Sequence, residues 1–281
     1  MKIYDALKIV AVAIVEGVTE WLPVSSTGHI ILFERFFPLS DGFSKDFKSL
    51  FDYLVQAGAI IAVLVYFRKT LFGGFKRDNR NKPASAVSLW LKVATASIPA
   101  ISAVFIDRLF DGLRPAAQTA LISAALIFYG LVFVIIEKLK ICKTPSRFCV
   151  RDLTYADALK IGAYQVLAAI PGTSRSGITI IGGMVSGCSR AAATEFSFYM
   201  AIPAITGASV YKTIGFALSG ASITPPEISA LLLGCVVAFV TSLLTMRFLT
   251  EFVKKRSFVS FGIYRILLGS IILILIFTGL I

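Results

Sequence analysis

Long apolar runs separated by short polar segments dominate the chain. Six of these runs are long enough to cross a bilayer as helices, which takes about 20 residues. They lie near residues 50–67, 88–106, 115–136, 194–212, 227–248 and 259–280. The pattern therefore predicts an all-α polytopic membrane protein.

Two further apolar regions, residues 3–38 and 155–190, are interrupted in the middle. The first is broken at residues 23–28 (PVSSTG) and the second at residues 171–177 (PGTSRSG). Proline and glycine end helices, and the small hydroxyl residues that follow can cap a new helix. We therefore expect each region to form a helix, a loop and a second helix, and the first helix of each region is too short to span the membrane.

The two broken regions also resemble each other. Aligning them with one inserted residue pairs Pro23 with Pro171, Ser26 with Ser174, and Gly28 with Gly177. Three spanning runs follow each region, and a basic segment joins the two halves near the middle of the chain. We therefore predict a single integral membrane domain, 1–281, built from an inverted-topology repeat. Each half, approximately 1–137 and 153–281, would contain one re-entrant helix–loop–helix and three transmembrane helices.

Composition supports this interpretation. Hydrophobic residues make up 57% of the chain and charged residues 16%, whereas soluble domains average about 45–50% apolar and about 25% charged. The net charge of +12 would suit a nucleic-acid partner, but the basic residues are bunched in short segments between the apolar runs. We therefore expect contacts with membrane lipids and none with nucleic acid. The four cysteines contain no C-x-x-C pair, so a thiolate zinc site is not expected.

The distribution of basic residues predicts an orientation. Segments 68–82, 138–151 and 247–256 together carry 15 Lys and Arg residues, whereas the alternate segments carry six. The positive-inside rule places the three richer segments in the cytoplasm. The first broken region then enters the membrane from outside and the second from the cytoplasm. We expect their loops to face each other across a polar cavity, because non-helical backbone at membrane depth needs such surroundings.

Titratable residues lie close to the first break. Glu16 and Glu20 are four residues apart, on one face of the first short helix, and carboxylates in apolar sequence mark function by default. A shallow helix, with both acids in headgroup water, is the alternative. Paired acids suit a divalent cation such as Mg²⁺ or Ca²⁺, or a general base beside a metal. His29 is the only histidine, which argues against a usual zinc site, and we predict that it transfers protons or acts as a nucleophile.

The loop at the second break is the strongest local signal. Its glycines let backbone N–H groups approach an anion, its hydroxyls add donors, and the following helix N-terminus adds partial positive charge. Arg175 brings a planar guanidinium that matches phosphate oxygens. An ordinary turn would not explain an arginine at membrane depth. A lipid with a phosphorylated headgroup is the simplest ligand for such a set of groups.

Two weaker pairs complete the set of candidate residues. Asp52 and Gln56 lie four residues apart on one span, and either face the same cavity or take part in packing. Arg190 and Glu195 are candidates for an ion pair near the cytoplasmic face.

Two of these motifs resemble those of the undecaprenyl-pyrophosphate phosphatase (bacitracin-resistance) family. The first motif covers residues 16–29 (EGVTEWLPVSSTGH) and the second residues 171–179 (PGTSRSGIT). Shorter matches are Phe51-Asp52, Gln56-Ala57-Gly58, Glu195-Phe196-Ser197-Phe198, Ile202-Pro203 and Ile263-Tyr264-Arg265. The resemblance therefore spans essentially the whole chain, although Asp52 stands where the family pattern leads us to expect glutamate.

The resemblance implies a hydrolase of the bacterial plasma membrane, with its active site open to the outer face. Such an enzyme converts undecaprenyl pyrophosphate to undecaprenyl phosphate and inorganic phosphate, which recycles the lipid carrier for cell-wall synthesis and confers bacitracin resistance. The resemblance also implies a divalent cation, Mg²⁺ or Ca²⁺, held by Glu16 and Glu20. The catalytic residues it implies are Glu20, Ser26, His29 and Arg175. The substrate-binding residues it implies are Gly172, Ser174, Arg175, Ser176 and Thr179.

These roles define an expected mechanism and its alternatives. Arg175 would hold the pyrophosphate, the cation would neutralise it, and Ser26 would attack the terminal phosphorus while His29 handles protons. Direct attack by water, with Ser26 only positioning, is one alternative. A secondary transporter or flippase for a polyprenyl phosphate is another, because inverted repeats with broken helices are typical of transporters. The sequence leaves open the choice of metal, the preferred tail length, and whether the chain works as a monomer or a homodimer.

Overall fold

The computed structural model describes residues 3–38, 43–73, 86–107, 109–110, 112–139 and 144–280. Apart from one isolated bridge between Arg147 and Cys188, the regular structure of these residues is helical. Five of the described helices are long and apolar enough to cross a membrane: α3 (Lys45–Tyr66), α7 (Pro115–Lys138), α10 (Arg190–Leu218), α11 (Pro225–Lys255) and α12 (Val259–Phe277). The chain is therefore all-helical and has the character of a polytopic membrane protein.

The run at 88–106, which we expected to form a sixth span, is divided. It forms the shorter apolar helix α5 (Ala86–Ala100), a turn, and the single-turn helix α6 (Ala103–Asp107). Pro99 lies in the last turn of α5. Because proline has no N–H and its ring crowds the preceding turn, it ends the helix there. The 15 residues of α5 fall short of the about 20 that a full span takes.

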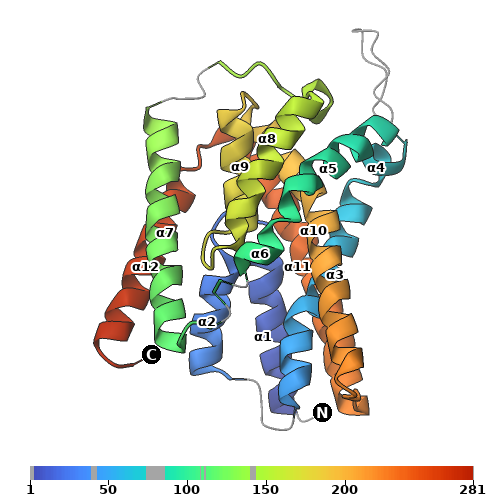
Figure 1. The fold of residues 1–281 in the computed structure, drawn as a ribbon, viewed down its shortest axis with the longest axis vertical. Coiled ribbons are helices and arrows are strands. Elements are labelled where there is room, and N and C mark those ends of the chain that lie inside the picture. The colour runs from blue at the N-terminus through green and yellow to red at the C-terminus, as the bar shows by residue number, and fades with distance from the viewer. Residues whose placement is uncertain are drawn as a thin grey trace.

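Both broken regions form the expected helix–loop–helix hairpins. The first hairpin consists of α1 (Ile3–Thr19) and α2 (Ser26–Phe36). The second consists of α8 (Tyr155–Gln165), the 3₁₀ turn η2 (Val166–Ala169) and α9 (Arg175–Val185). The hairpins enter the bundle from opposite ends, and their loops lie near its middle (Figure 1).

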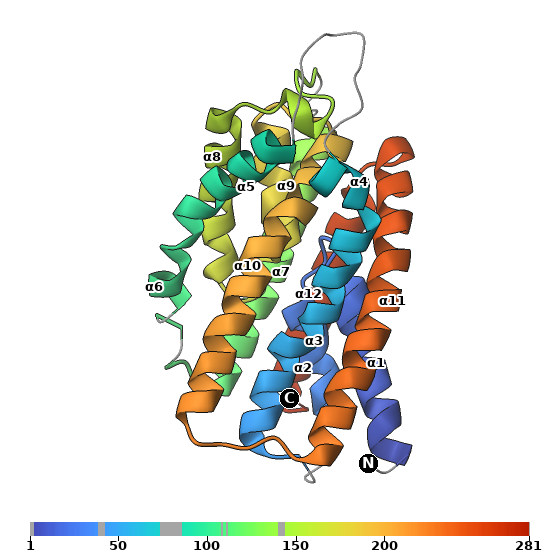
Figure 2. The same ribbon diagram turned by 90° about the vertical axis from the view of Figure 1, so that its right-hand side faces the viewer.

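The basic segments lie at one end of the bundle. The segments follow α3, α7 and α11, and the C-terminal ends of these three helices lie at the same end in both views (Figures 1 and 2). The short helices α4 (Arg68–Gly73) and η1 (Val150–Asp152) belong to this end as well. The two chain termini lie toward the other end (Figure 1). Six of the basic residues that predicted the orientation, Lys76, Arg77, Arg80, Lys82, Lys140 and Lys143, are outside the described residues.

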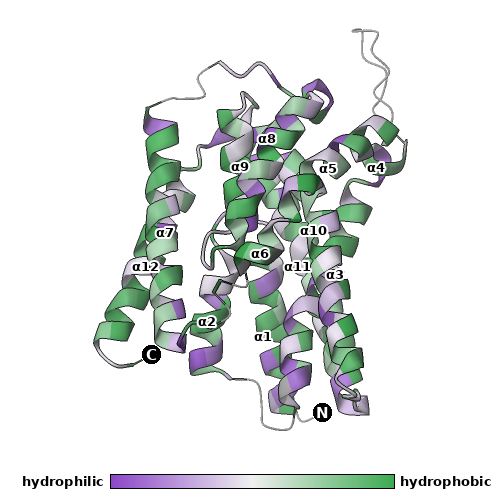
Figure 3. Cartoon of the chain, viewed as in Figure 1, coloured by the Kyte–Doolittle hydropathy of each residue, from purple (hydrophilic) through white to green (hydrophobic). Residues whose placement is uncertain are grey.

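Hydrophobic side chains cover much of the outer surface. α7 and α12, which pack along each other, are hydrophobic over most of their length (Figure 3). Large apolar side chains such as Phe128 on α7 and Leu232 on α11 are more than half exposed. Such faces suit lipid rather than water, because monomeric soluble proteins rarely expose large apolar patches.

The first helix of each hairpin packs closely on a helix of the other half of the chain: α1 on α11, and α8 on α5. A glycine makes each approach close. A Cβ atom at Gly17 would lie 2.0 Å from Oγ1 of Thr241, and a Cβ atom at Gly162 would lie 2.1 Å from the carbonyl oxygen of Ala96. No larger residue fits at Gly162 unless the backbone shifts, so this glycine is needed for the close contact of α8 with α5.

Candidate active site

The two loops meet at an ion pair. Nη2 of Arg175, the first residue of α9, lies 3.2 Å from Oε1 of Glu20, which follows the end of α1. Ser26, the first residue of α2, donates its hydroxyl to the other oxygen of Glu20, Oε2, at 3.0 Å. The side chains of Arg175 and Glu20 are only 13% and 10% exposed. The structure thus brings together the Arg175 guanidinium, the Glu20 carboxylate and the Ser26 hydroxyl, which we predicted from two distant segments.

The loops also touch each other directly. The Ser176 hydroxyl donates to the carbonyl oxygen of Leu22 at 3.1 Å. Loop carbonyls at membrane depth need donors, and here the opposite loop supplies one. The polar cavity that we expected between the loops stays a prediction.

Arg265, on α12, holds the two loops together and was missed as a site residue. It is fully buried. Its Nη1 donates to the carbonyl oxygen of Pro23 at 3.3 Å, and its Nη2 donates to those of Gly172 and Thr173 at 3.0 Å each. The sequence contained the signal, because an arginine inside an apolar span is as costly as Arg175 and needs the same explanation.

A second set of contacts holds the Arg175 side chain in place. Nη1 of Arg175 donates to the carbonyl oxygen of Ser197 on α10 at 3.0 Å. The hydroxyls of Thr179 and Ser197 lie 2.7 Å apart, and Thr179 also donates to the carbonyl oxygen of Arg175 at 2.8 Å. Thr179 is completely buried, and its hydrogen bonds fix the backbone of Arg175 relative to Ser197. Ser197 lies in a motif that the sequence analysis noted, but it was not singled out as a candidate.

The residue before each inner helix has an unusual backbone conformation. Ser25, before α2, has φ 73°, and Ser174, before α9, has φ 71°; they are the only non-glycine residues with positive φ in the described chain. Such conformations cost about 1–3 kcal/mol and cluster at functional sites. Ser174 offsets part of this cost by accepting the N–H of Gly177 at 3.2 Å. Gly172 also has a positive φ, 88°, and a Cβ there would lie 2.6 Å from the carbonyl oxygen of Ile122.

His29 lies one turn after Ser26 but is bonded to other groups. Its Nδ1 lies 2.7 Å from the carbonyl oxygen of Ser25, and its Nε2 lies 2.6 Å from the hydroxyl of Tyr264. The rings of His29 and Tyr264 are also nearly parallel, with centroids 5.6 Å apart. Because a carbonyl only accepts, Nδ1 carries a proton. In this structure the group that accepts the Ser26 proton is Glu20, not His29.

Glu16 is the least satisfied polar side chain of the site. It is fully buried, and neither carboxylate oxygen has a hydrogen-bond partner. Glu20 and Asp52 are the charged groups that act on it most strongly, and Gln56 lies alongside. One oxygen of Asp52 is also buried without a partner. Asp52 and Gln56 therefore lie beside the acids, as one of the two interpretations of this pair expected.

The described residues contain no group of three or more histidine, cysteine or acidic side chains placed to hold a metal ion. A divalent cation would therefore depend on Glu16 and Glu20, with phosphate and water oxygens completing its shell. This arrangement is usual for Mg²⁺, which keeps several waters and few carboxylates. The two unpaired oxygens of Glu16 fit such an ion.

Comparison with known proteins identifies the family. The sequence pattern of the family described as "Bacitracin resistance protein BacA" matches residues 9–271. The chain belongs to this family. An undecaprenyl-diphosphatase of Lachnoclostridium phytofermentans is 44% identical over 272 residues, which is 97% of each chain. An undecaprenyl-diphosphatase of Enterococcus faecalis is 41% identical over 275 residues, which is 96% of this chain and 97% of the relative.

All the residues of the site fall inside the part of the chain that matches the BacA family. The match begins before Glu16 and ends after Arg265, so it contains both loops and the second hairpin, whereas α1 begins at Ile3, before the matched residues. The buried unit of Arg175, Glu20 and Ser26 thus lies within the family match.

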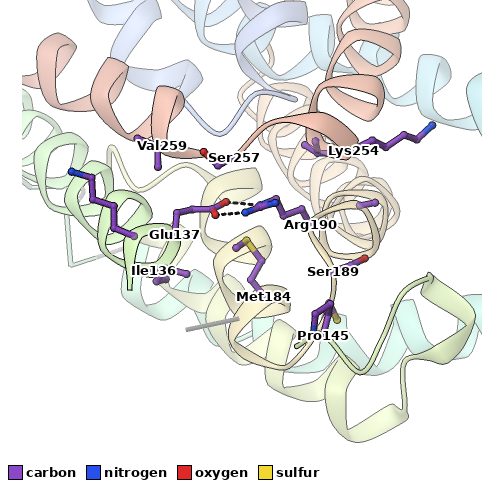
Figure 4. Close-up of a pocket in the computed structure, with 13 residues that line it drawn as sticks. Ile136, Glu137, Pro145, Met184, Ser189, Arg190, Lys254, Ser257 and Val259 are labelled. Atoms are coloured by element: carbon purple, nitrogen blue, oxygen red, sulfur yellow. Dashed lines mark hydrogen bonds and ion pairs between the residues drawn. The ribbon is translucent and has the colours of Figure 1, made fainter. Parts of the chain in front are cut away.

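A separate cavity of about 540 Å³ lies at the end of the bundle that carries the basic segments. Figure 4 shows Glu137 of α7 and Arg190 of α10 facing each other in it, joined by two hydrogen bonds. Glu137 also accepts the backbone N–H of Phe258 at 3.0 Å. The predicted pair of Arg190 with Glu195 is therefore wrong: Arg190 binds Glu137, and Glu195 accepts the hydroxyl of Tyr199 one helical turn away.

Proposed function

We propose that this protein hydrolyses undecaprenyl diphosphate to undecaprenyl phosphate and inorganic phosphate in the bacterial plasma membrane. The observation that carries the proposal is the buried contact of Arg175, Glu20 and Ser26. Phosphoryl transfer needs what these groups supply: charge neutralisation, a proton acceptor, and a nucleophile or a group that orients water. The relatives named undecaprenyl-diphosphatase, at 41–44% identity, supply the substrate. Their activity accounts for carrier recycling in cell-wall synthesis and for bacitracin resistance.

Arg175 is the group that we propose binds the terminal phosphate. Its guanidinium would exchange the Glu20 oxygen for phosphate oxygens and keep its hydrogen bond to the Ser197 carbonyl. The N-termini of α2 and α9 add partial positive charge at the same place. Ser174 and Ser176 shape the loop, because each is bonded within the protein.

In the proposed reaction Ser26 Oγ attacks the terminal phosphorus, and its proton passes to Oε2 of Glu20. The bond from that phosphorus to the bridging oxygen breaks, and undecaprenyl phosphate leaves with the bond electrons. Water then attacks the phosphoserine and releases inorganic phosphate, which regenerates Ser26. Direct attack by water oriented by Ser26 and Glu20 is the alternative. In both schemes His29, held by Tyr264 and the Ser25 carbonyl, positions the first turn of α2.

We propose that Mg²⁺ or Ca²⁺ is held by Glu16 and Glu20. When bound, the ion would neutralise charge on the phosphate oxygens. The unpaired carboxylate of Glu16 supports this role. Oε1 of Glu20 would turn from Arg175 to the ion when phosphate takes its place on the guanidinium, and Oε2 would keep the Ser26 hydroxyl, so cation and substrate would enter the site together.

We also propose that residues 1–137 and 153–281 are inverted repeats. The hairpins enter from opposite ends (Figure 1), and each inner helix follows a serine with φ near 70°, 73° at Ser25 and 71° at Ser174. α1 packs on α11 as α8 packs on α5, and α7 packs on α12. With the basic segments in the cytoplasm, the first hairpin would enter from outside and the active site would open to the outer face.

Cysteine labelling tests this orientation. In a background without the four native cysteines, Ser222→Cys, on the loop between α10 and α11, should react with an impermeant maleimide in intact cells. Lys254→Cys, at the basic end, should react only after the membrane is permeabilised. The opposite result would reverse the orientation.

Phosphate release tests the activity. Purified protein in detergent should release phosphate from undecaprenyl diphosphate and should lose this activity with a chelator. A phosphoserine trapped at Ser26 would support attack by the serine, and an active Ser26→Ala variant would support direct attack by water. Movement of labelled lipid across liposomes without any phosphate release would favour the transporter alternative.

A further inference from the structure

An apolar groove of about 550 Å³ leads away from the site along the outside of the bundle. Its walls come from α1, α11 and α12 together with the first hairpin loop. Apolar residues dominate the lining, among them Val15, Val18, Phe248, Phe252 and Phe261. Phe248 is 54% exposed, so part of the wall faces the surroundings of the bundle rather than its core.

The groove is lined by neighbours of the proposed active-site residues. Leu22 lines the groove, and its carbonyl oxygen accepts the Ser176 hydroxyl of the second loop. His29 and Tyr264 also line it, and His29 lies one turn from Ser26. A molecule with its headgroup at Arg175 could therefore place its apolar tail in this groove, which begins at neighbours of Glu20 and Ser26.

We infer that this groove binds the first prenyl units of the lipid substrate. The inference rests on the proposed function and adds the part of the substrate that the site selects. Ligand pockets of about 300–1,000 Å³ hold drug-sized molecules, so the groove holds a few prenyl units and leaves the rest of the chain in the bilayer. The lining favours this occupant over a second phosphate or a polar solute, because the residues along the groove offer few hydrogen-bonding groups to either.

Filling the groove tests the inference. Ser260 on α12 is an exposed, small lining residue, so Ser260→Trp should narrow the groove without disturbing the core. We expect kcat/KM for undecaprenyl diphosphate to fall about tenfold, the loss expected when roughly two buried CH₂ groups lose their contacts. The value for isopentenyl diphosphate, which has a single prenyl unit, should stay unchanged. Ser229→Trp, at an exposed position near the start of α11, is the matched control and should change neither value.

The outcomes separate this inference from the proposed function. If the wild type releases phosphate from neither substrate, the proposed function fails. If the wild type is active and Ser260→Trp changes both substrates equally or neither of them, the groove does not bind the tail. If Ser260→Trp converts a dimer in detergent to a monomer, the groove is instead an interface between two copies.

Photo-crosslinking gives a readout that does not depend on turnover. A polyprenyl diphosphate analogue with a diazirine on its second prenyl unit should label residues between Phe248 and Tyr264, and excess undecaprenyl diphosphate should suppress the labelling. Label only on other faces of the bundle would overturn the inference, even in a fully active enzyme.

Discussion

The two hairpins have a similar backbone and opposite chemistry. Each descends to mid-depth from its own end of the bundle (Figure 1) and begins its inner helix after a serine with positive φ. The first hairpin carries the acids Glu16 and Glu20 and the hydroxyl of Ser26. The second carries Arg175 and a loop of glycine and hydroxyl residues. The shared backbone directs the N-termini of α2 and α9 toward the same site. The first hairpin supplies the acidic groups and the hydroxyl of this site, and the second supplies the positive charge.

The hairpins also differ in how well their polar groups are bonded. In the second hairpin, the hydroxyls of Ser174, Ser176 and Thr179 have partners within the protein, whereas Thr173 Oγ1 and Arg175 Nε are buried without partners. In the first hairpin, both oxygens of Glu16 are buried without partners. Buried polar groups are normally bonded, and exceptions call for an explanation. Arg175 is still bonded through both of its Nη atoms, whereas the whole Glu16 carboxylate is unbonded, so the first hairpin has the greater need of a bound cation.

Removal of Arg175 should have the largest effect on the comparison, because it breaks the only ion pair that the described residues form between the two hairpins. We expect Arg175→Ala to lower kcat/KM by about 10²–10³, as loss of one strong electrostatic donor does. Arg175→Lys keeps the charge but loses the planar fork, so it should retain part of the activity. Phosphate release from undecaprenyl diphosphate measures both variants. Near-normal activity of the alanine variant would show that the phosphate binds elsewhere.

The next largest effect should come from the first hairpin. Ser26→Ala removes the hydroxyl bonded to Glu20, and we expect kcat to fall about 100-fold or more, which is the range for groups that act in proton transfer or attack. Ser25→Gly is the matched control, because glycine adopts φ 73° without strain. A control variant as inactive as Ser26→Ala would mean that the cap, not the hydroxyl, controls activity.

The sequence predicted both hairpins, because proline, glycine and hydroxyl residues broke apolar runs at two places. It also predicted that Glu20, Ser26 and Arg175 belong together. The register of the two breaks was less accurate: the alignment paired Ser26 with Ser174, but the capping residues are Ser25 and Ser174. Residue identity cannot show this, because a cap is defined by backbone conformation and the pattern offers two adjacent serines.

Long-range partners were the part that sequence reasoning could not supply. Arg265 lies about 90 residues beyond the second loop and binds three backbone carbonyls, which carry no sequence signal. For the same reason the partner of Arg190 was wrongly predicted, because Glu137 is 53 residues away whereas Glu195 is near in sequence.

Loss of Arg265 should affect both hairpins, because this side chain binds one carbonyl of the first loop and two of the second. Arg265→Met leaves three buried carbonyl groups without these hydrogen bonds, and each unsatisfied group costs about 1–3 kcal/mol. We expect the thermal unfolding temperature to fall by several degrees and activity by about tenfold. Arg175→Met serves as the comparison and should lose more activity with a smaller change in unfolding temperature. Equal temperature shifts would mean that Arg265 does not hold the loops together.

The unpaired Glu16 predicts a change in cation dependence. Glu16→Gln keeps the shape but removes the negative charge, so we expect about tenfold more Mg²⁺ to be needed for half-maximal activity. Asp52→Asn, which alters a neighbouring acid, should have a smaller effect. A Glu16→Gln variant with unchanged Mg²⁺ dependence would remove Glu16 from the cation site.

The smallest effect should come from Tyr264, which contacts the first hairpin through His29. Tyr264→Phe removes the hydroxyl that lies 2.6 Å from Nε2 but keeps the ring that stacks on the imidazole. One hydrogen bond is worth about 1 kcal/mol, so kcat/KM for undecaprenyl diphosphate should fall only about fivefold. A loss of 100-fold would be too large for positioning. It would mean that the proton leaves Ser26 through His29 and Tyr264, and that Glu20 serves only Arg175 and the cation.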